Sequence, residues 1–357
     1  MIETSEQLRH FLDSAAQKYG NAPCAVDTEA DSLHRYSESL CLVQFAIGKE
    51  IKLIDPLAVE DLSPLMDFFQ GRIVWMHGAD YDMTMFKREF SDIPDVVYDT
   101  QIGARLLGLR QFGLGNLVEH YFDVVLAKTS QKADWGRRPL SEKMVEYALD
   151  DVRYLIEMGE TIINQLKSLD RFEWFLESCE DARIKVLERS GEREDPWRIQ
   201  GSGKLSPRGL AYLRALWNWR DAEAKSWDRP TFMVCGNKQL ISWCLDFCED
   251  RTPRLPNHYR PGRRRRFEDA VASAKALAES KWPQRIKGKR SRRPKDFEAK
   301  LDALVSVRNA AAQKLAIDPS LIAPRAALEA IAGGQEDANQ MLLNWQKNLL
   351  NLSESEG

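Results

Sequence analysis

The chain has 357 residues, of which 43% are hydrophobic and 29% are charged, so it is long enough for two or three domains of ordinary globular composition. It contains no run of about 18 apolar residues, and its N-terminal helix pattern lacks the features of a secretory signal, so neither a membrane-spanning nor a secreted protein is expected. The net charge is −3, and the six cysteines, none in a CxxC pair, predict reduced thiols in a cytoplasmic protein.

Strand and helix patterns alternate over the first 170 residues. The segments with strand patterns are 25–30, 41–47, 51–55, 73–77 and 96–98. The first three predict an antiparallel meander with a turn at Gly48. The fourth is a continuous apolar run, which is typical of a strand covered on both faces. Strands that come first and then alternate with helices favour a mixed sheet flanked by helices.

An acidic pair lies within the first predicted strand, where Thr28 separates Asp27 from Glu29. Side chains alternate along a strand, so the two carboxylates point to the same face and repel each other. A bound divalent cation would remove this repulsion, because hard oxygen ligands suit Mg²⁺ and Mn²⁺. The alternative is a strand edge whose acidic face lies in water.

A second acidic signal, the segment HGADYDM at residues 77–83, directly follows the apolar strand. It therefore lies at the carboxyl end of that strand, where the sites of α/β proteins collect. Asp80 and Asp82 both fall at the start of the next predicted helix. Either one could be a helix N-cap and nothing more, so the residues alone leave the choice between site and cap open.

A long helix is predicted over residues 141–168, with Ser141 as its N-cap. Tyr147 and Asp151 are four residues apart and therefore share one face of this helix. Asp150 is rotated away from that face by roughly 100°, since a helix has about 3.6 residues per turn. The helix thus offers one tyrosine and one carboxylate to a common site.

The second half of the chain has a different charge. Residues 1–200 hold 36 acidic and 23 basic side chains, whereas residues 201–300 hold 11 acidic and 24 basic ones. The composition of residues 190–207 predicts a linker, and the patterns of residues 206–282 and 296–351 predict helical units. The tryptophans of the first unit are interpreted as core residues, with base stacking as the alternative: Trp217, Trp219, Trp227 and Trp243. A basic block of this size is typical of a surface that faces a polyanion, although a solvated charged linker would give the same composition.

The order of these motifs resembles the DEDD exonuclease superfamily in its tyrosine-bearing branch, and most closely the ribonuclease D family. The segments that carry the resemblance are LVQF (42–45), IDPL (54–57), YDTQI (98–102) and KTSQKADWGRRPL (128–140), which runs into YALDD (147–151). The resemblance extends over most of the chain. Residues 205–284 look like the helicase-and-ribonuclease-D C-terminal (HRDC) domain, and residues 297–352 look like a second copy.

The resemblance implies a ribonuclease-H-like α/β exonuclease domain, with a mixed sheet flanked by helices, followed by one or two all-α HRDC domains. The expected boundaries are 1–190 for the exonuclease domain, 191–204 for a linker, 205–284 for the first HRDC domain, 285–296 for a basic linker and 297–352 for a second HRDC-like domain. A monomer is favoured.

The resemblance also assigns roles to single residues. The metal ligands that it implies are Asp27, Glu29, Asp82 and Asp151, and Tyr147 would position the attacking water. It favours Asp82 over Asp80, because the family's Asp lies five residues after the strand-ending His, here His77. The chain departs from the family at Ala30, where an aromatic residue is common.

The implied reaction is the hydrolysis of phosphodiester bonds with two Mg²⁺ or Mn²⁺ ions, which releases 5′-mononucleotides from the free 3′ end of an RNA. Precursors of transfer RNA and other small structured RNAs are the expected substrates. A 3′→5′ DNA exonuclease of the proofreading or repair type is the alternative within the same chemistry, and a non-catalytic nucleic-acid-binding module is the alternative from another class. Substrate contacts are expected at Lys128 and Gln131, unless these lie on an exposed loop, and at Arg264 and Arg265 through phosphates.

Overall fold

The computed structural model describes residues 1–127, 130–189, 191, 194–286, 293–335 and 337–352. The chain divides into two compact units. The first, called the sheet unit here, comprises Met1–Ala30, Leu40–Arg189 and Ser291–Gly357, and the second, the helical unit, comprises Asp31–Ser39 and Ser190–Arg290. Within the described ranges, no helix is long and apolar enough to cross a membrane.

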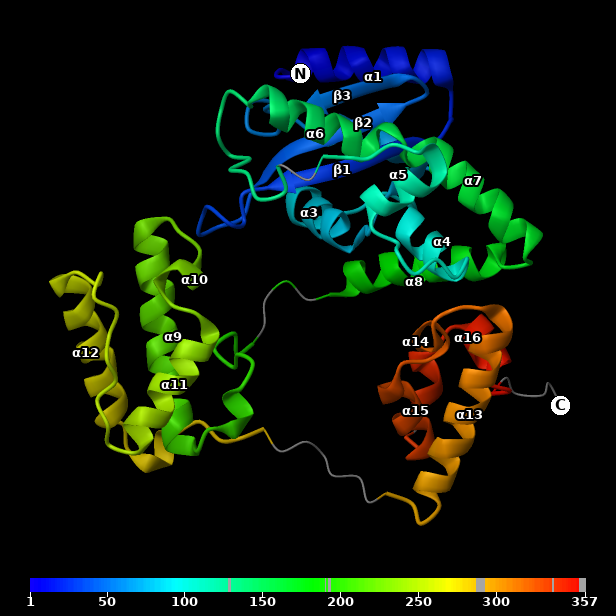
Figure 1. Ribbon diagram of the computed structural model, residues 1–357. Coiled ribbons are helices and arrows are strands. Elements are labelled where there is room, and N and C mark those ends of the chain that lie inside the picture. Colours follow the sequence, from blue (N-terminus) through cyan, green and yellow to red (C-terminus); the bar gives the residue numbers. More distant parts are fainter. Residues whose placement is uncertain (128–129, 190, 192–193, 287–292, 336, 353–357) are drawn as a thin grey trace. The chain divides into compact units, whose positions relative to one another are not determined.

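The sheet unit is built around a five-stranded sheet with the order β3-β2-β1-β4-β5 (Figure 1). The strands are β1 (Cys24–Ala30), β2 (Leu40–Ile47), β3 (Glu50–Ile54), β4 (Ile73–Met76) and β5 (Val96–Asp99). β1, β2 and β3 form an antiparallel meander, and β4 and β5 run parallel to β1. The mixed sheet predicted from the sequence is therefore confirmed.

Helices cover both faces of this sheet. They are α1 (Ser5–Tyr19), α2 (Ser63–Phe69), α3 (Asp80–Phe90), α4 (Thr100–Leu106), α5 (Leu114–Phe122), α6 (Glu142–Arg153), α7 (Leu155–Ser168) and α8 (Phe172–Glu188). Successive side chains of β1 enter different apolar cores: Cys24 and Val26 pack with α1, α2 and α3, whereas Ala25 packs with α4, α7 and α8. A strand covered in this way is apolar on both faces, so an acidic side chain on it needs a compensating partner.

The single helix predicted over residues 141–168 is wrong in one respect, because two helices, α6 and α7, occupy this range. The backbone leaves helical geometry at Tyr154, where φ is −103° and ψ is −8°. α6 packs on β2 and β3, whereas α7 packs on α4 and β4. A Cβ at Gly159 of α7 would come within 2.6 Å of the Trp75 indole, so α7 approaches β4 too closely for a larger residue. The break lets the two halves follow different neighbours.

The last helices of the chain pack on the sheet unit. They are α13 (Phe297–Leu315), α14 (Pro319–Ile322), α15 (Arg325–Ala332) and α16 (Asn344–Leu349). The ring of Trp345 stacks on that of Trp174 in α8, with centroids 5.0 Å apart. The buried Arg171 guanidinium donates to the carbonyl oxygens of Leu106 and Leu315, at 2.7 and 2.8 Å. Residues from 291 onward therefore cluster with the sheet, while the boundaries of a second HRDC-like domain stay a prediction.

The helical unit consists mainly of α9 (Pro207–Trp227), α10 (Thr231–Val234), α11 (Asn237–Cys248) and α12 (Pro261–Lys275). Trp219 and Trp243 are buried and pack edge-on against Phe267, each with centroids 5.1 Å apart. These two tryptophans are core residues, as expected. Trp227 is instead exposed, with the Arg263 guanidinium 5.1 Å from its ring.

Candidate functional site

Three carboxylates meet beside the central strand. Asp27 and Glu29 project from the same face of β1, and Asp151 projects from α6. Each offers one carboxylate oxygen, and these oxygens all lie within 4.8 Å of one another. The spacing of two on a strand and the face of the helix, both read from the sequence, therefore converge on one point. This oxygen set suits a hard divalent cation.

The two acidic residues at the start of α3 have different surroundings. Asp82 is buried and accepts a hydrogen bond from the Thr28 hydroxyl at 2.6 Å, which fixes it beside β1 but outside the group of three. Asp80 is exposed and forms an ion pair with Arg189 at 2.6 Å. The structure thus brings Asp82, and not Asp80, to the acidic residues of β1.

Burial and mutual repulsion dominate the electrostatics of these carboxylates. Burial, together with the charges of Asp151 and Asp82, raises the pKa of Glu29 to about 9. Burial also raises the pKa of Asp82 to about 7 and that of Asp151 to about 7, and it raises the pKa of Asp27 well above its usual range, with further contributions from the neighbouring carboxylates. Such a cluster holds protons at neutral pH unless a cation neutralises it. The residues therefore fit a metal.

Tyr147 lies one turn before Asp151 on α6 and lines a cavity of about 310 Å³ together with Asp27 and Asp151. Burial raises the pKa of the Tyr147 hydroxyl, and the negative charges of Asp151, Glu29 and Asp27 raise it further. The phenol therefore keeps its proton at neutral pH and acts as a hydrogen-bond donor.

Other residues of the same cavity were only partly anticipated. Gln131 lines it, as its predicted substrate contact requires, whereas Lys128 lies outside the described residues. His77 also lines the cavity; its Nδ1 lies 2.9 Å from the Thr100 hydroxyl, and burial lowers its pKa. Asp150 lies at the wall but is paired with Arg153. Gln131 is thus the one predicted contact residue seen at the cavity.

Sequence reasoning gave no role to Arg138, which anchors the segment before α6. Its guanidinium donates to both carboxylate oxygens of the buried Asp55, at 2.5 and 2.6 Å. It also donates to the carbonyl oxygens of Trp135, Arg137 and Cys41, at 2.7, 3.0 and 2.7 Å. All five N–H donors are used. The anchor holds the segment against β2 and the end of β3.

Trp135 lies in the segment that Arg138 anchors, and its ring packs beside the Tyr147 ring. Its indole is fully buried, and the two ring centroids are 6.1 Å apart. Trp135 therefore acts as a packing residue of this site. The signal for Arg138 was present as an Arg-Arg-Pro sequence preceding α6, but only its distant partner, Asp55, reveals which of the two arginines is the partly buried anchor.

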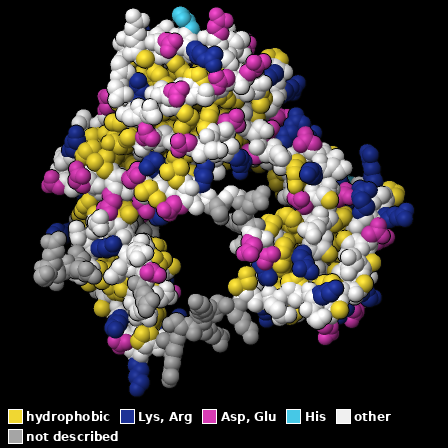
Figure 2. Space-filling model, turned by 180° about the vertical axis from the view of Figure 1, so that it is seen from behind, with side chains coloured by type: hydrophobic (Ala, Val, Ile, Leu, Met, Phe, Trp, Pro, Cys, Tyr) yellow, Lys and Arg dark blue, Asp and Glu magenta, His cyan; other side chains and the backbone are white. Residues whose placement is uncertain are grey.

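The predicted contact residues of the basic half lie on α12. Arg264 donates to the carbonyl oxygens of Tyr259 and Pro256, at 2.9 and 2.7 Å, so its guanidinium is already engaged. Arg265 is exposed and has no side-chain hydrogen bond or ion pair with any described residue. On the face seen in Figure 2, basic, acidic and apolar side chains alternate over the described surface without forming one continuous basic patch.

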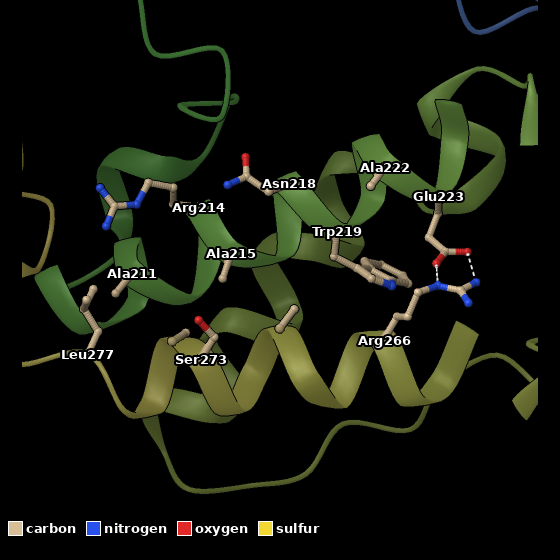
Figure 3. A pocket seen from close by; sticks show the side chains of 12 residues that line it. Ala211, Arg214, Ala215, Asn218, Trp219, Ala222, Glu223, Arg266, Ser273 and Leu277 are labelled. Atoms are coloured by element: carbon tan, nitrogen blue, oxygen red, sulfur yellow. Dashed lines mark hydrogen bonds and ion pairs between the residues drawn. The ribbon is translucent and has the colours of Figure 1, made fainter. Parts of the chain in front are cut away.

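A separate cavity of about 460 Å³ lies between α9 and α12. Figure 3 shows small side chains along its walls, with Arg214 toward one end and the ion pair of Arg266 with Glu223 at the other. Neither Arg264 nor Arg265 lines this cavity. The cavity and the predicted contact residues of the helical unit are therefore different places.

Comparisons with known proteins show which families the chain is similar to. The 3′-5′ exonuclease family matches residues 1–167, and the HRDC domain matches residues 209–243. The chain is 29% identical to ribonuclease D of Sphingobium indicum, over 97% of this chain and 91% of the relative. The chain is thus similar to proteins of the ribonuclease D family. It is also 34% identical to ribonuclease D of Xanthomonas oryzae pv. oryzae, where the match covers 61% of each chain.

Solved structures agree with this similarity. The chain is similar to the crystal structure of Escherichia coli RNase D, with a TM-score of 0.73 and 25% identity over 98% of both chains. A protein from Bifidobacterium adolescentis shares the fold, with a TM-score of 0.80, 24% identity and coverage of 98% and 94%. The chain spans about three fifths of the length of the first curated relatives of the ribonuclease D family that it matches.

Proposed function

We propose that the chain is a metal-dependent 3′→5′ exoribonuclease that releases 5′-mononucleotides. The observation that carries this proposal is the convergence of Asp27, Glu29 and Asp151 within 4.8 Å beside a cavity that Tyr147 also lines. Similarity to curated ribonuclease D proteins supports it. The division into an exonuclease domain over 1–190 and HRDC domains over 205–284 and 297–352 belongs to the same proposal.

Asp27, Glu29, Asp82 and Asp151 would hold two divalent cations, with Asp27 shared between them. Such ions would activate water as a nucleophile and stabilise the leaving 3′ oxygen. The chain itself supplies the position of these oxygens: Thr28 fixes Asp82 through its hydroxyl, and the strand geometry of β1 fixes Asp27 and Glu29. Mg²⁺ and Mn²⁺ are both compatible with an all-carboxylate set.

Tyr147 would orient the attacking water. Its raised pKa makes it a donor and not a base at neutral pH, which supports orientation over proton abstraction. Gln131 would contact the sugar-phosphate backbone at the cavity wall, and Arg265, exposed on α12, would contact phosphates elsewhere on the RNA. Lys128 and Arg264 remain predicted contacts, the latter requiring its guanidinium to serve a phosphate in addition to two carbonyl groups.

The proposed substrate is an RNA with a free 3′ end, such as a transfer RNA precursor, acted on by a monomer in the cytoplasm. The solved Escherichia coli RNase D is described as an exoribonuclease involved in structured RNA processing, which supports RNA over DNA. The four carboxylates alone do not distinguish the two, so a repair-type DNA exonuclease is the second candidate.

The test is a time course on a 5′-labelled RNA with a single-stranded 3′ tail and on the DNA of the same sequence, with Mg²⁺, Mn²⁺ or a chelator. Asp82→Asn is compared with Asp80→Asn, a matched control on the same helix whose carboxylate is exposed and paired with Arg189. A metal-dependent ladder that shortens from the 3′ end, absent in Asp82→Asn and retained in Asp80→Asn, is expected. Faster loss of DNA would favour the repair candidate, and no hydrolysis of either would refute the proposal.

A further inference from the structure

A cavity of about 750 Å³ lies within the sheet unit and is lined by residues other than those of the acidic cluster. The connection between α4 and α5 forms one wall, and α13 with the start of α14 forms the other. Its size falls in the range of about 300–1,000 Å³ that ligand sites occupy in proteins. At Gly108, a Cβ would come within 2.3 Å of the Ala316 carbonyl oxygen, so the two walls touch at their base. We refer to this space as the upstream cavity.

The side chains of the upstream cavity suit a polyanion. Arg110 is exposed and has no hydrogen bond or ion pair within the described part of the chain. The Arg105 guanidinium lies 5.3 Å from the centre of the Phe112 ring, which gives a flat cationic surface beside an aromatic one. Asn309 and Gln313 of α13 add amide groups to the opposite wall. Arginine and aromatic side chains together are typical of sites that bind phosphates and stack bases.

One acidic side chain, Asp318, also lines this cavity. The Asp318 carboxylate already accepts hydrogen bonds from the backbone N–H and the hydroxyl of Ser320, at 2.7 and 2.6 Å. These bonds lower its pKa, and the charges of Arg105 and Arg308 lower it further. Asp318 therefore stays ionised as the N-cap of α14 and offsets part of the charge of Arg105, whereas Arg110 has no ion pair with any described residue.

The upstream cavity and the cavity lined by Asp27, Tyr147 and Asp151, called the acidic cavity here, are lined by one continuous stretch of backbone. Arg105, Arg110 and Phe112 line the first, and the residues from Gly113 to Asn116 line the second. Arg110 and Gly113 are three residues apart, so their Cα atoms lie within about 11 Å of each other, given at most about 3.6 Å per residue. A single strand whose 3′ end occupies the acidic cavity therefore reaches the upstream cavity within a few nucleotides.

We propose that the upstream cavity binds the single-stranded RNA a few nucleotides 5′ of the scissile bond, through phosphate contacts from Arg110 and Arg105 and stacking of a base against the Arg105–Phe112 surface. This inference rests on the proposed exoribonuclease function and names how that site holds its substrate. Because the contacts lie beyond the terminal nucleotide, they act on binding of longer tails and not on the chemical step.

The experiment measures KM and kcat for wild type and Arg110→Gln on a dinucleotide and on a twelve-nucleotide single-stranded RNA. Arg110→Gln should raise KM for the longer RNA about tenfold, with kcat and both constants for the dinucleotide within twofold of wild type. Loss of one phosphate contact should also reduce the slope of log affinity against log salt by about 0.7. Lys49→Gln removes an exposed charge on the turn between β2 and β3 and is the matched control. It should leave KM and kcat for both substrates unchanged.

The outcomes separate this inference from the function on which it rests. If wild type degrades neither RNA, the proposed function is wrong. If wild type degrades both and Arg110→Gln leaves KM for the longer RNA unchanged, or raises KM for both substrates equally, the upstream cavity is not the binding site. The double variant Arg105→Gln/Arg110→Gln, which also removes the stacked guanidinium, should extend the effect on the longer RNA alone. An unchanged melting temperature in each variant establishes that the fold is kept.

Discussion

Two regions bury carboxylates equally well but treat their charge in opposite ways. Glu223 of the helical unit is 5% exposed, and Asp82 of the sheet unit is 4% exposed. Burial would raise the pKa of Glu223, but hydrogen bonds from Arg266 and Arg263 outweigh it and lower the pKa. Asp82 accepts hydrogen bonds from the Thr28 hydroxyl and from backbone groups but forms no ion pair among the described residues, and burial raises its pKa to about 7.

The difference teaches where each region obtains its positive charge. The helical unit carries its cations in its own sequence, so Glu223 is a structural element that links α9 to α12. The described structure pairs no arginine or lysine with the acidic cluster, so the proposed metal would supply its positive charge. An excess of buried charge that the chain does not neutralise is expensive for folding, which is why it marks a site of function.

The largest expected effect is on the acidic side of this comparison. Asp27→Asn removes the carboxylate that two metal ions would share, so turnover on RNA should fall at least about a hundredfold, since each tenfold corresponds to about 1.4 kcal/mol of barrier. The same change relieves repulsion, so the metal-free variant should melt at a higher temperature than metal-free wild type. A turnover assay on RNA measures the first effect, and melting curves with Mg²⁺ and with chelator measure the second. A variant that is as active as wild type, or that is less stable than wild type without metal, would contradict the assignment.

The next prediction concerns pH. Carboxylates whose folded pKa is raised stabilise the fold below their unfolded pKa of about 4 and lose that contribution as pH rises through the folded value. Metal-free protein should therefore lose a few kcal/mol of stability from pH 5 to pH 9, as Asp82 and Asp151 ionise near pH 7 and Glu29 near pH 9. Urea midpoints at pH 5, 7 and 9 should show this decline in chelator and a much smaller one in saturating Mg²⁺. A flat profile in chelator would mean that the cluster is not repulsive.

A smaller effect, on stability, is expected when Glu223, the carboxylate that pairs with two arginines, is replaced. Glu223→Gln keeps the shape but leaves Arg263, whose side chain is largely buried, without its charge partner, which should destabilise the protein by about 2 kcal/mol. Hydrolysis of a dinucleotide should be unaffected below the melting temperature, and Mg²⁺ should not rescue stability. Rescue of stability by Mg²⁺ would show that the site of Glu223, like the acidic cluster, obtains positive charge from a metal ion.

The smallest predicted effect tests the anchor of the cavity wall. Arg138→Lys replaces five donors by three and loses the paired contact with Asp55, so Tyr147 should be less well oriented and kcat should fall about tenfold with KM within twofold. Arg137→Lys, at the exposed neighbour, is the control and should behave like wild type. An equal rise in KM alone would indicate that Arg138 serves binding and not orientation.

The sequence was sufficient for the sheet and for the convergence of the acidic residues because both depend on short-range periodicity. A spacing of two on a strand put Asp27 and Glu29 together, and a spacing of four on a helix put Tyr147 beside Asp151. The choice of Asp82 over Asp80 needed the family resemblance, since both stand at the start of α3, and only the tertiary fold buries one of them.

What the sequence missed depends on partners far apart in the chain. Arg138 and Asp55 are separated by 83 residues, and no local pattern links them. The break between α6 and α7 arises from the different neighbours that each half packs against. The segment Asp31–Ser39, which clusters with the helical unit although it joins two strands of the sheet, is likewise a product of tertiary contacts: the Tyr36 hydroxyl donates to Asp221 at 2.9 Å.

The packing of α16 against α8 has a consequence for synthesis. During translation, the sheet and α8 are synthesised well before residue 345. Until then Trp174 lacks the Trp345 ring that stacks on it, and Arg171 lacks the Leu315 carbonyl to which it donates. The sheet unit therefore finishes folding only after the whole helical unit has been translated, which reverses the usual order in which N-terminal regions are completed first. During that interval the nascent chain presents an apolar helix face, and a chaperone that shields it would raise the yield of folded protein.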